Sequence, residues 1–147
     1  MIRIHELEIT THCHATEDCS KVLKAIFNIV PPSLRDRIEV HKQLLHGYYG
    51  NEIVVYTVKV KDQADEILSY LASKLSDSEK AILSATLDLR YDHRTNKLYL
   101  RINKQEAFKD NIILYDSDDI VKITLSFKHS RGIKRVREYL REKGLIK

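Results

Sequence analysis

The stretch Glu39–Lys61, EVHKQLLHGYYGNEIVVYTVKVK, carries the strongest structural signal in the chain. Residues 53–60 are largely apolar and β-branched in both of their alternating sets, which predicts a strand covered on much of both faces. Residues 38–45 are more polar and form the expected partner strand. Between them, Gly47-Tyr48-Tyr49-Gly50-Asn51 contains two glycines and an asparagine, which tolerate the backbone angles of a turn. The stretch therefore predicts a long β-hairpin.

The rest of the chain mixes strands and helices. The alternation in the first strand slips near His5-Glu6, as it would at a β-bulge. Strands are expected at residues 2–9, 98–102, 112–115 and 120–127, and helices from Thr16 to Val30, from Asp62 to Leu75, from Ser76 to about Leu89, at 104–110 and at 131–143. This pattern predicts an α+β fold, in which a mixed or antiparallel sheet has helices packed on one face.

Polar residues mark where three of these helices are expected to begin. Thr16 and Asp62 are the expected N-caps of the first two helices. Ser76-Asp77-Ser78-Glu79 matches a capping box, with serine at the N-cap and glutamate at N3. The helix that follows Ser76 is expected to bury one apolar face, formed by Ile82, Ala85 and Leu89 or their neighbours.

Composition sets the class of protein. A chain of 147 residues with 31% charged and 43% hydrophobic residues fits a soluble globular domain. Its apolar runs are too short to span a bilayer, and charged residues interrupt any signal-peptide pattern at the start. Two cysteines, Cys13 and Cys19, suggest no disulfide framework, so a reducing cytoplasm is the default location.

Positive charge is concentrated at the end of the chain. Residues 128–147 contain eight Lys or Arg and two Glu, a net charge of +6, whereas the whole chain carries +4. We therefore divide the chain into an α+β domain, residues 1–127, and a basic helical extension, residues 128–147. Such a basic segment is typical of contact with phosphate, although basic helices also serve solubility.

Two clusters of potential metal ligands lack the spacing of known sites. His12-Cys13-His14 with Cys19 has no standard zinc spacing, which favours a polar strand end leading into a helix cap. The turn Asp116-Ser117-Asp118-Asp119 fails the EF-hand pattern, because valine and phenylalanine stand where glycine and glutamate are needed. A two-metal nuclease site remains an alternative for the aspartates. We expect no metal and no cofactor.

Two other motifs suggest contact with nucleic acid. Gly47-Tyr48-Tyr49-Gly50 matches the G-x-x-G of KH domains, but that loop joins helices and this one joins strands. Its tyrosines offer either surfaces for stacking bases or packing against the sheet. Arg101-x-x-Lys104-Gln105-x-Ala107-Phe108 places two cations, an amide and an aromatic at a strand end, which suits phosphates and bases or simply a charged strand face.

Three stretches, in this order, resemble an archaeal family of RNA-binding proteins or predicted exosome subunits. They are His14-Ala15-Thr16-Glu17-Asp18 followed by Lys21–Ala25, Gly47–Ile53, and Arg101-Ile102-Asn103-Lys104-Gln105-Glu106-Ala107-Phe108. The resemblance covers about residues 2–127. It implies a fold similar to the large-subunit ribosomal protein that holds 5S rRNA. The chain departs from the family pattern at Tyr48, Glu52 and Asn103, where the family has His, Pro and an acidic residue.

The resemblance implies a non-catalytic, RNA-binding accessory protein of the cytoplasm that is linked to the exosome or to RNA processing. The expected RNA contacts are Tyr48, Tyr49, Arg101, Lys104, Gln105, Phe108, Arg131, Lys134, Arg135 and Arg137. Two alternatives stay open: a protein-interaction or dimerisation module without RNA affinity, and a metal-dependent nuclease or phosphoesterase. A homodimer is compatible with either binding role, and no membrane contact is expected.

Overall fold

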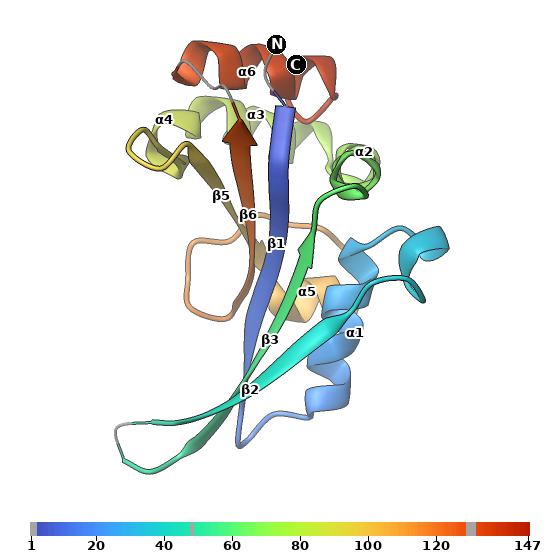
Figure 1. Ribbon diagram of the computed structural model, residues 1–147, viewed down its shortest axis with the longest axis vertical. Helices are drawn as coiled ribbons and strands as arrows, with labels where there is room; N and C mark the ends of the chain where they lie inside the picture. Colours follow the sequence, from blue (N-terminus) through green and yellow to red (C-terminus); the bar gives the residue numbers. More distant parts are fainter. Residues whose placement is uncertain (1–2, 48, 129–131) are drawn as a thin grey trace.

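The computed structural model describes residues 3–47, 49–128 and 132–147. Its core is one antiparallel sheet with the strand order β2-β3-β1-β6-β5-β4 (Figure 1). The strands are β1 Arg3–His14, β2 Val40–His46, β3 Glu52–Val60, β4 Tyr91–Asp92, β5 Lys97–Asn103 and β6 Ile120–Lys128. The helices are α1 Cys19–Ile29, the 3-10 turn η1 Pro32–Leu34, α2 Ala64–Lys74, α3 Asp77–Ala85, α4 Leu87–Arg90, α5 Lys104–Phe108 and α6 Ile133–Glu142. The predicted α+β class, with an antiparallel sheet, is confirmed.

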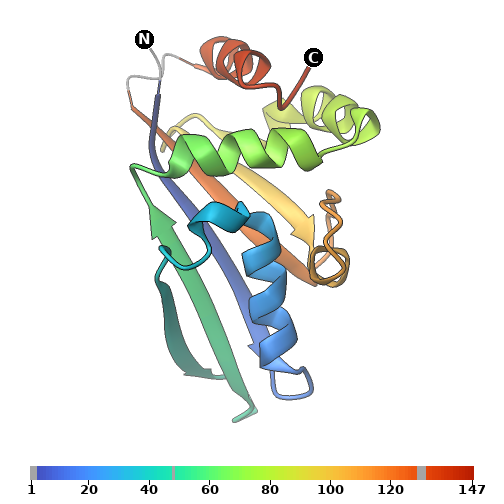
Figure 2. The same cartoon turned by 90° about the vertical axis from the view of Figure 1, so that its right-hand side faces the viewer.

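The two faces of the sheet differ in chemistry. On β1, Leu7, Ile9, Thr11 and Cys13 are buried and face the core, whereas the residues that alternate with them remain at least partly exposed. Helices α1 and α2 lie against the core face, in front of the sheet in Figure 2. The opposite face, which we call the open face, carries mostly polar side chains because successive residues of a strand point to opposite sides.

The first strand is longer than expected. It continues to His14 because residues 10–14 pair with β3, in a register that joins Thr10 to Thr57 and His14 to Ile53. The register with β6 shifts between Ile4 and Glu6, which confirms the irregularity expected at His5-Glu6. This length allows β1 to carry polar side chains along the whole open face.

The predicted hairpin is confirmed as β2 and β3. Gly50 has φ +80°, a left-handed angle that glycine adopts without strain. Burial is less complete than predicted: Tyr56, Val58 and Val60 are buried, but Ile53 to Val55 are only half-buried. The reason is that β2 is an edge strand and the hairpin projects beyond the helices (Figure 1).

Two predicted N-caps are wrong. The cap of α1 is Asp18, which accepts a hydrogen bond from the Ser20 backbone N–H at 3.0 Å, and Thr16 lies in the preceding turn. The N-cap position of α2 is Gln63, whose side chain makes no capping bond, so Asp62 lies one residue too early. In each case a short polar side chain correctly indicated that a helix begins nearby, but it did not identify the N-cap residue.

The capping box is confirmed at its serine. Ser76 Oγ accepts a bond from the Glu79 backbone N–H at 3.2 Å. The Glu79 carboxylate instead accepts from the Leu114 N–H at 2.7 Å. That bond helps to explain why residues 112–115 are no strand: within the described chain this segment meets the sheet at one isolated bridge, between Leu114 and Ile102. The prediction of a strand there is wrong.

The predicted apolar face of the helix after Ser76 is also shifted. The chain forms two helices, α3 and α4, which meet at Thr86. Leu83 and Leu87 are fully buried, whereas Ile82 and Leu89 are exposed to 45% and 88%. Leu83 and Leu87 are four residues apart, which is the spacing of one helical face, so neighbours of the predicted residues enter the core.

The final helix joins the same core. Val136 and Leu140 are fully buried and Ile133 is half-buried, and their spacing of three and four residues puts them on one face of the helix. The Tyr139 ring packs edge-on against Phe127 of β6, with 5.7 Å between ring centroids. The division of the chain at residue 127 stays a prediction.

Cys13 and Cys19 form a disulfide, a bond that the sequence pattern did not lead us to expect. The bond links the end of β1 to the first residue of α1 across the turn that contains Glu17. Two cysteines do not form the pattern of several pairs by which a disulfide framework is recognised in a sequence.

Candidate nucleic-acid interface

The open face contains a polar pocket where three strands meet. We call it the sheet pocket; its volume is about 350 Å³, and it is lined by Thr10, Thr11, His12, His14, Arg101, Lys104, Asp118, Ile120 and Lys122. The register explains this grouping. Lys122 of β6 is the direct partner of Arg101 on β5 and of Thr10 on β1, so the three residues form one row across the sheet.

Positive charge dominates this row. Arg101 and Lys122 lie directly opposite each other, an arrangement of like charges that destabilises a sheet. Lys122 also lies over the Tyr99 ring, with its Nζ 5.6 Å from the ring centroid. Asp118 is the one carboxylate among the lining residues. An anion bound in the pocket would relieve the repulsion between the two cations.

Two histidines extend the cluster along β1. His12 and His14 point to the same face because they are two residues apart in a strand, and their ring centroids are 6.3 Å apart. Partial burial and the charges of His14, Lys104 and Lys122 hold the pKa of His12 below its ordinary value. Three neighbouring basic groups therefore act on His12, which is the electrostatic sign of a site for anions.

Lys104 lies beneath this pocket and differs from expectation. As a predicted RNA contact it would have to be exposed to solvent, but its side chain is only 4% exposed. Its Nζ donates to the His12 carbonyl at 2.8 Å and to both Glu17 carboxylate oxygens at 3.0 and 3.1 Å, and it lies 3.1 Å from Asp119 Oδ1. The ammonium is thus engaged within the protein, and its burial follows from being paired with two carboxylates.

Asp119 belongs to the same network. Burial raises the pKa of its carboxyl, but hydrogen bonds from Gln105 and Lys104 and the charges of Lys104 and His14 outweigh this and lower the pKa overall. The Gln105 amide donates to Asp119 Oδ2 at 3.0 Å. Two of the sequence motifs, around Glu17 and around Lys104, therefore meet in one set of contacts that fixes α5 against the start of α1.

A second small pocket lies on the other side of Lys104. It has a volume of about 300 Å³ and is lined by Thr16, Glu17, Asp18, Lys21, Val22, Lys104, Gln105 and Phe108. The half-buried Phe108 ring is flanked by Lys21 and Lys24 of α1, whose Nζ atoms lie 5.6 and 5.1 Å from the ring centroid. We call Lys21, Lys24, Gln105 and Phe108 the α5 cluster. Lys104 lines both pockets and forms the wall between them.

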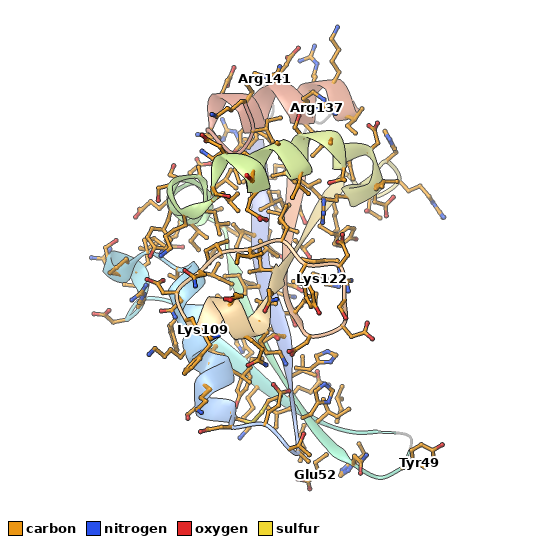
Figure 3. The ribbon with its side chains drawn as sticks, turned by 180° about the vertical axis from the view of Figure 1, so that it is seen from behind. Tyr49, Glu52, Lys109, Lys122, Arg137 and Arg141 are labelled. Carbon is orange, nitrogen blue, oxygen red and sulfur yellow. A yellow bond between two sulfur atoms is a disulfide. The ribbon has the colours of Figure 1, made fainter. Side chains whose placement is uncertain are left out.

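The other predicted contacts lie elsewhere. Tyr49 is 86% exposed at the tip of the hairpin, and Figure 3 shows it far from Lys109 at the end of α5. On α6, Lys134 and Arg135 are exposed, whereas Arg137 donates to the Ser84 carbonyl and hydroxyl at 3.1 Å each. Lys122 lies between these two ends of the molecule (Figure 3). Tyr48 and Arg131 fall outside the described residues.

The predicted residues thus form no single patch. The structure groups Arg101, Lys104, Gln105 and Phe108 around the two pockets and leaves Tyr49 and the α6 residues apart. Sequence reasoning missed Lys122, and it considered His12 and His14 only as metal ligands. Lys122 falls within the predicted strand 120–127, whereas His12 and His14 lie after the predicted end of the first strand at residue 9. The strand register that brings Lys122 opposite Arg101 was not visible in the sequence.

Other parts of the described chain lack such a concentration of positive charge or metal ligands. A larger pocket of about 750 Å³ lies beside α6, but Asp62, Asp65, Glu138 and Glu142 there offset the charges of Arg3, Lys61, Lys128, Arg135 and Lys143. Within residues 3–47, 49–128 and 132–147, no group of three or more His, Cys, Asp or Glu side chains is placed to hold a metal ion. None of the helices in these ranges is long and apolar enough to cross a membrane.

Comparison with known proteins identifies a family and related archaeal proteins. A family model described as RNA binding matches residues 6–127 of the chain. An uncharacterized protein of Methanocaldococcus jannaschii is 30% identical over 127 residues, which cover 85% of each chain. RNA-binding protein PAB1135 of Pyrococcus abyssi is 27% identical over 147 residues, with 95% of each chain covered.

Two crystal structures of archaeal proteins have the same fold. Protein AF2318 of Archaeoglobus fulgidus is 25% identical with a TM-score of 0.81, and the match covers 96% of this chain and 99% of that one. Protein SSO0741 of Sulfolobus solfataricus is 23% identical with a TM-score of 0.77, covering 94% and 98%. Both carry the family label DUF54. Their likeness extends along almost the whole chain.

Proposed function

The chain belongs to the RNA-binding family that matches its residues 6–127, and on this premise we propose that it binds RNA on the open face of its sheet. One observation carries the proposal: Arg101 and Lys122 lie directly opposite each other in the sheet pocket, beside His12 and His14. Like charges held together at a cost in stability are expected where a ligand of opposite charge binds. The phosphates of RNA supply that charge.

The two pockets suggest how RNA is held. Arg101 and Lys122 would bind backbone phosphates, which position the nucleic acid without reading its sequence. Tyr99, next to Lys122 on the open face, and Phe108 of the α5 cluster are planar groups on which bases can stack. In this proposal Lys104 contacts no phosphate, because its ammonium is already bound by two carboxylates, and it acts by holding the two surfaces together.

The proposal is tested by one substitution with two readouts. Lys122→Gln removes a cation from the repelling pair, so we expect weaker RNA binding and an unchanged or higher melting temperature. The slope of log K against log salt should flatten by roughly 0.7–0.9, the value for one lost phosphate contact. Arg94→Gln is the matched control, because Arg94 is exposed in the turn before β5, away from both pockets.

The two variants distinguish RNA binding at the sheet pocket from attraction by the net charge of the protein. If Lys122→Gln and Arg94→Gln weaken RNA binding equally, the affinity reflects net charge alone and the sheet pocket is not the interface. If neither variant nor the wild-type protein binds RNA at low salt, RNA binding itself is rejected. The protein-interaction alternative would then be the better description of the chain.

We also propose the finer role that the family resemblance implies, a non-catalytic accessory protein of the cytoplasm that works with the exosome or another RNA-processing assembly. RNA bound on an exposed sheet face remains accessible to a second protein, which suits such a role. The test is co-purification of a tagged chain with exosome subunits from an archaeal extract, before and after ribonuclease treatment. Absence of these subunits in both cases would remove the exosome link and leave RNA binding untouched.

A further inference from the structure

His12 and His14 give the sheet pocket two ionisable groups among fixed cations. Both rings lie on the open face of β1 and line the pocket with Arg101 and Lys122. In the described part of the chain, no hydrogen bond occupies a ring nitrogen of either histidine; the bonds at these two residues involve their backbone. The imidazoles are therefore placed to contact a ligand in the pocket.

Charged groups from several elements surround the two rings. His12 faces His14, Lys104 of α5 and Lys122 of β6, and the charge of His14 helps to lower the pKa of Asp119, in the turn before β6. Arg101 of β5 and Asp118 complete the lining, and the β3 partners of His12 and His14 are the uncharged Val55 and Ile53. The charges that act on His12 are those of His14, Lys104 and Lys122, all of them basic, so an added proton on His12 is unfavourable while the pocket holds no anion.

A bound phosphate changes this balance. Its negative charge next to the imidazoles offsets the repulsion from Lys122 and Lys104 and favours the imidazolium forms. Each imidazolium then supplies N–H donors to phosphate oxygens, and such charge-assisted hydrogen bonds are stronger than neutral ones. Binding of the anion and uptake of protons therefore stabilise each other.

We propose that the sheet pocket is a phosphate subsite that takes up protons when it is filled, with His12 and His14 holding an RNA backbone phosphate as imidazolium ions. The inference rests on the proposed RNA-binding function and deepens it. It makes RNA affinity depend on pH between about 5.5 and 7.5, the range in which histidine titrates. No bond is made or broken in this step, and the protons come from solvent.

The sign follows from linkage. The pKa of His12 lies below its ordinary value in the free protein and rises when a phosphate is bound. The bound state therefore holds more protons in this interval, so affinity increases as pH falls through the bound-state pKa and is lost as pH rises above it. For each proton taken up, affinity changes by at most roughly tenfold per pH unit.

The test measures the affinity of an RNA oligonucleotide without terminal phosphates at pH 5.5, 6.5 and 7.5 and constant salt. Such RNA has no phosphate group that titrates in this range. We expect roughly tenfold tighter binding at pH 5.5 than at 7.5 for the wild-type protein, and a nearly flat profile for the double variant His12→Gln, His14→Gln. His41→Gln is the control: His41 lies on β2 outside the pocket, and this variant should keep the wild-type profile.

Histidine ring resonances in NMR spectra report the proton uptake at its site. The pKa of His12 should rise when RNA is added, and inorganic sulfate at high concentration should produce a smaller rise if the pocket recognises the anion itself. RNA binding with the same pH profile in the wild-type and double-variant proteins would overturn the inference and leave the proposed function intact. If the wild-type protein binds no RNA at any of the three pH values, the proposed function is overturned instead. Thermal melts at each pH confirm that the variants are folded.

Discussion

At the scale of single residues, Lys104 joins two motifs that lie 87 residues apart in the chain. Its ammonium is held by Glu17, Asp119 and the His12 carbonyl. The sequence indicated a functional motif around Lys104. However, the residue pattern at a strand end is the same whether the lysine side chain points to solvent or binds a carboxylate. Only the fold brings Glu17 within reach, which is why the lysine was expected to be exposed.

We predict that Lys104→Ala lowers the free energy of unfolding by about 1–3 kcal/mol. This is less than for a fully buried ion pair, because Glu17 and Asp119 keep 21% and 46% of their side-chain surface exposed and regain water when the lysine is lost. Urea denaturation measures the change, and Lys109→Ala, an exposed position just after α5, is the control, expected within about 0.5 kcal/mol of wild type. Equal stability of the two variants would show that the network contributes little.

Asp119 gives the same network a pH dependence. Its pKa is lowered in the folded protein, so its contribution to stability is present above the unfolded-state pKa and is lost as pH falls through the folded-state value. We predict that the difference in melting temperature between wild type and Asp119→Asn is constant from pH 5 to 7 and shrinks below about pH 4, near the ordinary pKa of aspartate. A difference that grows on acidification would contradict this assignment.

At the scale of elements, periodicity located most strands and helices but not their ends. The alternation of residues 98–102 and the helical spacing of Val136 and Leu140 reported burial directly, because each pattern is the imprint of a covered face. The predictions of N-caps at Thr16 and Asp62 were wrong because several polar residues stand near each helix start. The prediction of a strand at residues 112–115 was wrong because an apolar run can be buried without pairing along its length with a neighbouring strand.

The basic helix α6 illustrates a mixed role. Lys134 and Arg135 are exposed, but Val136 and Leu140 are part of the core, so removal of residues 128–147 would unfold structure as well as remove charge. We predict that Lys134→Ala with Arg135→Ala flattens the salt dependence of RNA binding at unchanged melting temperature, whereas Leu140→Ala costs about 2–5 kcal/mol of stability. An unchanged salt slope in the double variant would exclude α6 from the interface.

At the scale of the whole molecule, positive charge is distributed differently along the sequence and in the folded structure. The sequence placed all excess positive charge in residues 128–147. The fold adds a second concentration in the sheet pocket, built from β1, β5 and β6, which are separated in the chain and joined by register. The α+β class followed from local patterns, but the site did not, because it depends on which strands become neighbours.

The most direct test of the proposed interface is ultraviolet crosslinking of RNA to the purified protein, with the crosslinked peptides identified by mass spectrometry. The proposal predicts crosslinks in peptides that contain Tyr99, Phe108 and residues 10–14, because these line or border the two pockets. Lys122→Gln should reduce them in parallel with affinity. Crosslinks confined to Tyr49 at the hairpin tip, with none near the sheet pocket, would contradict the account.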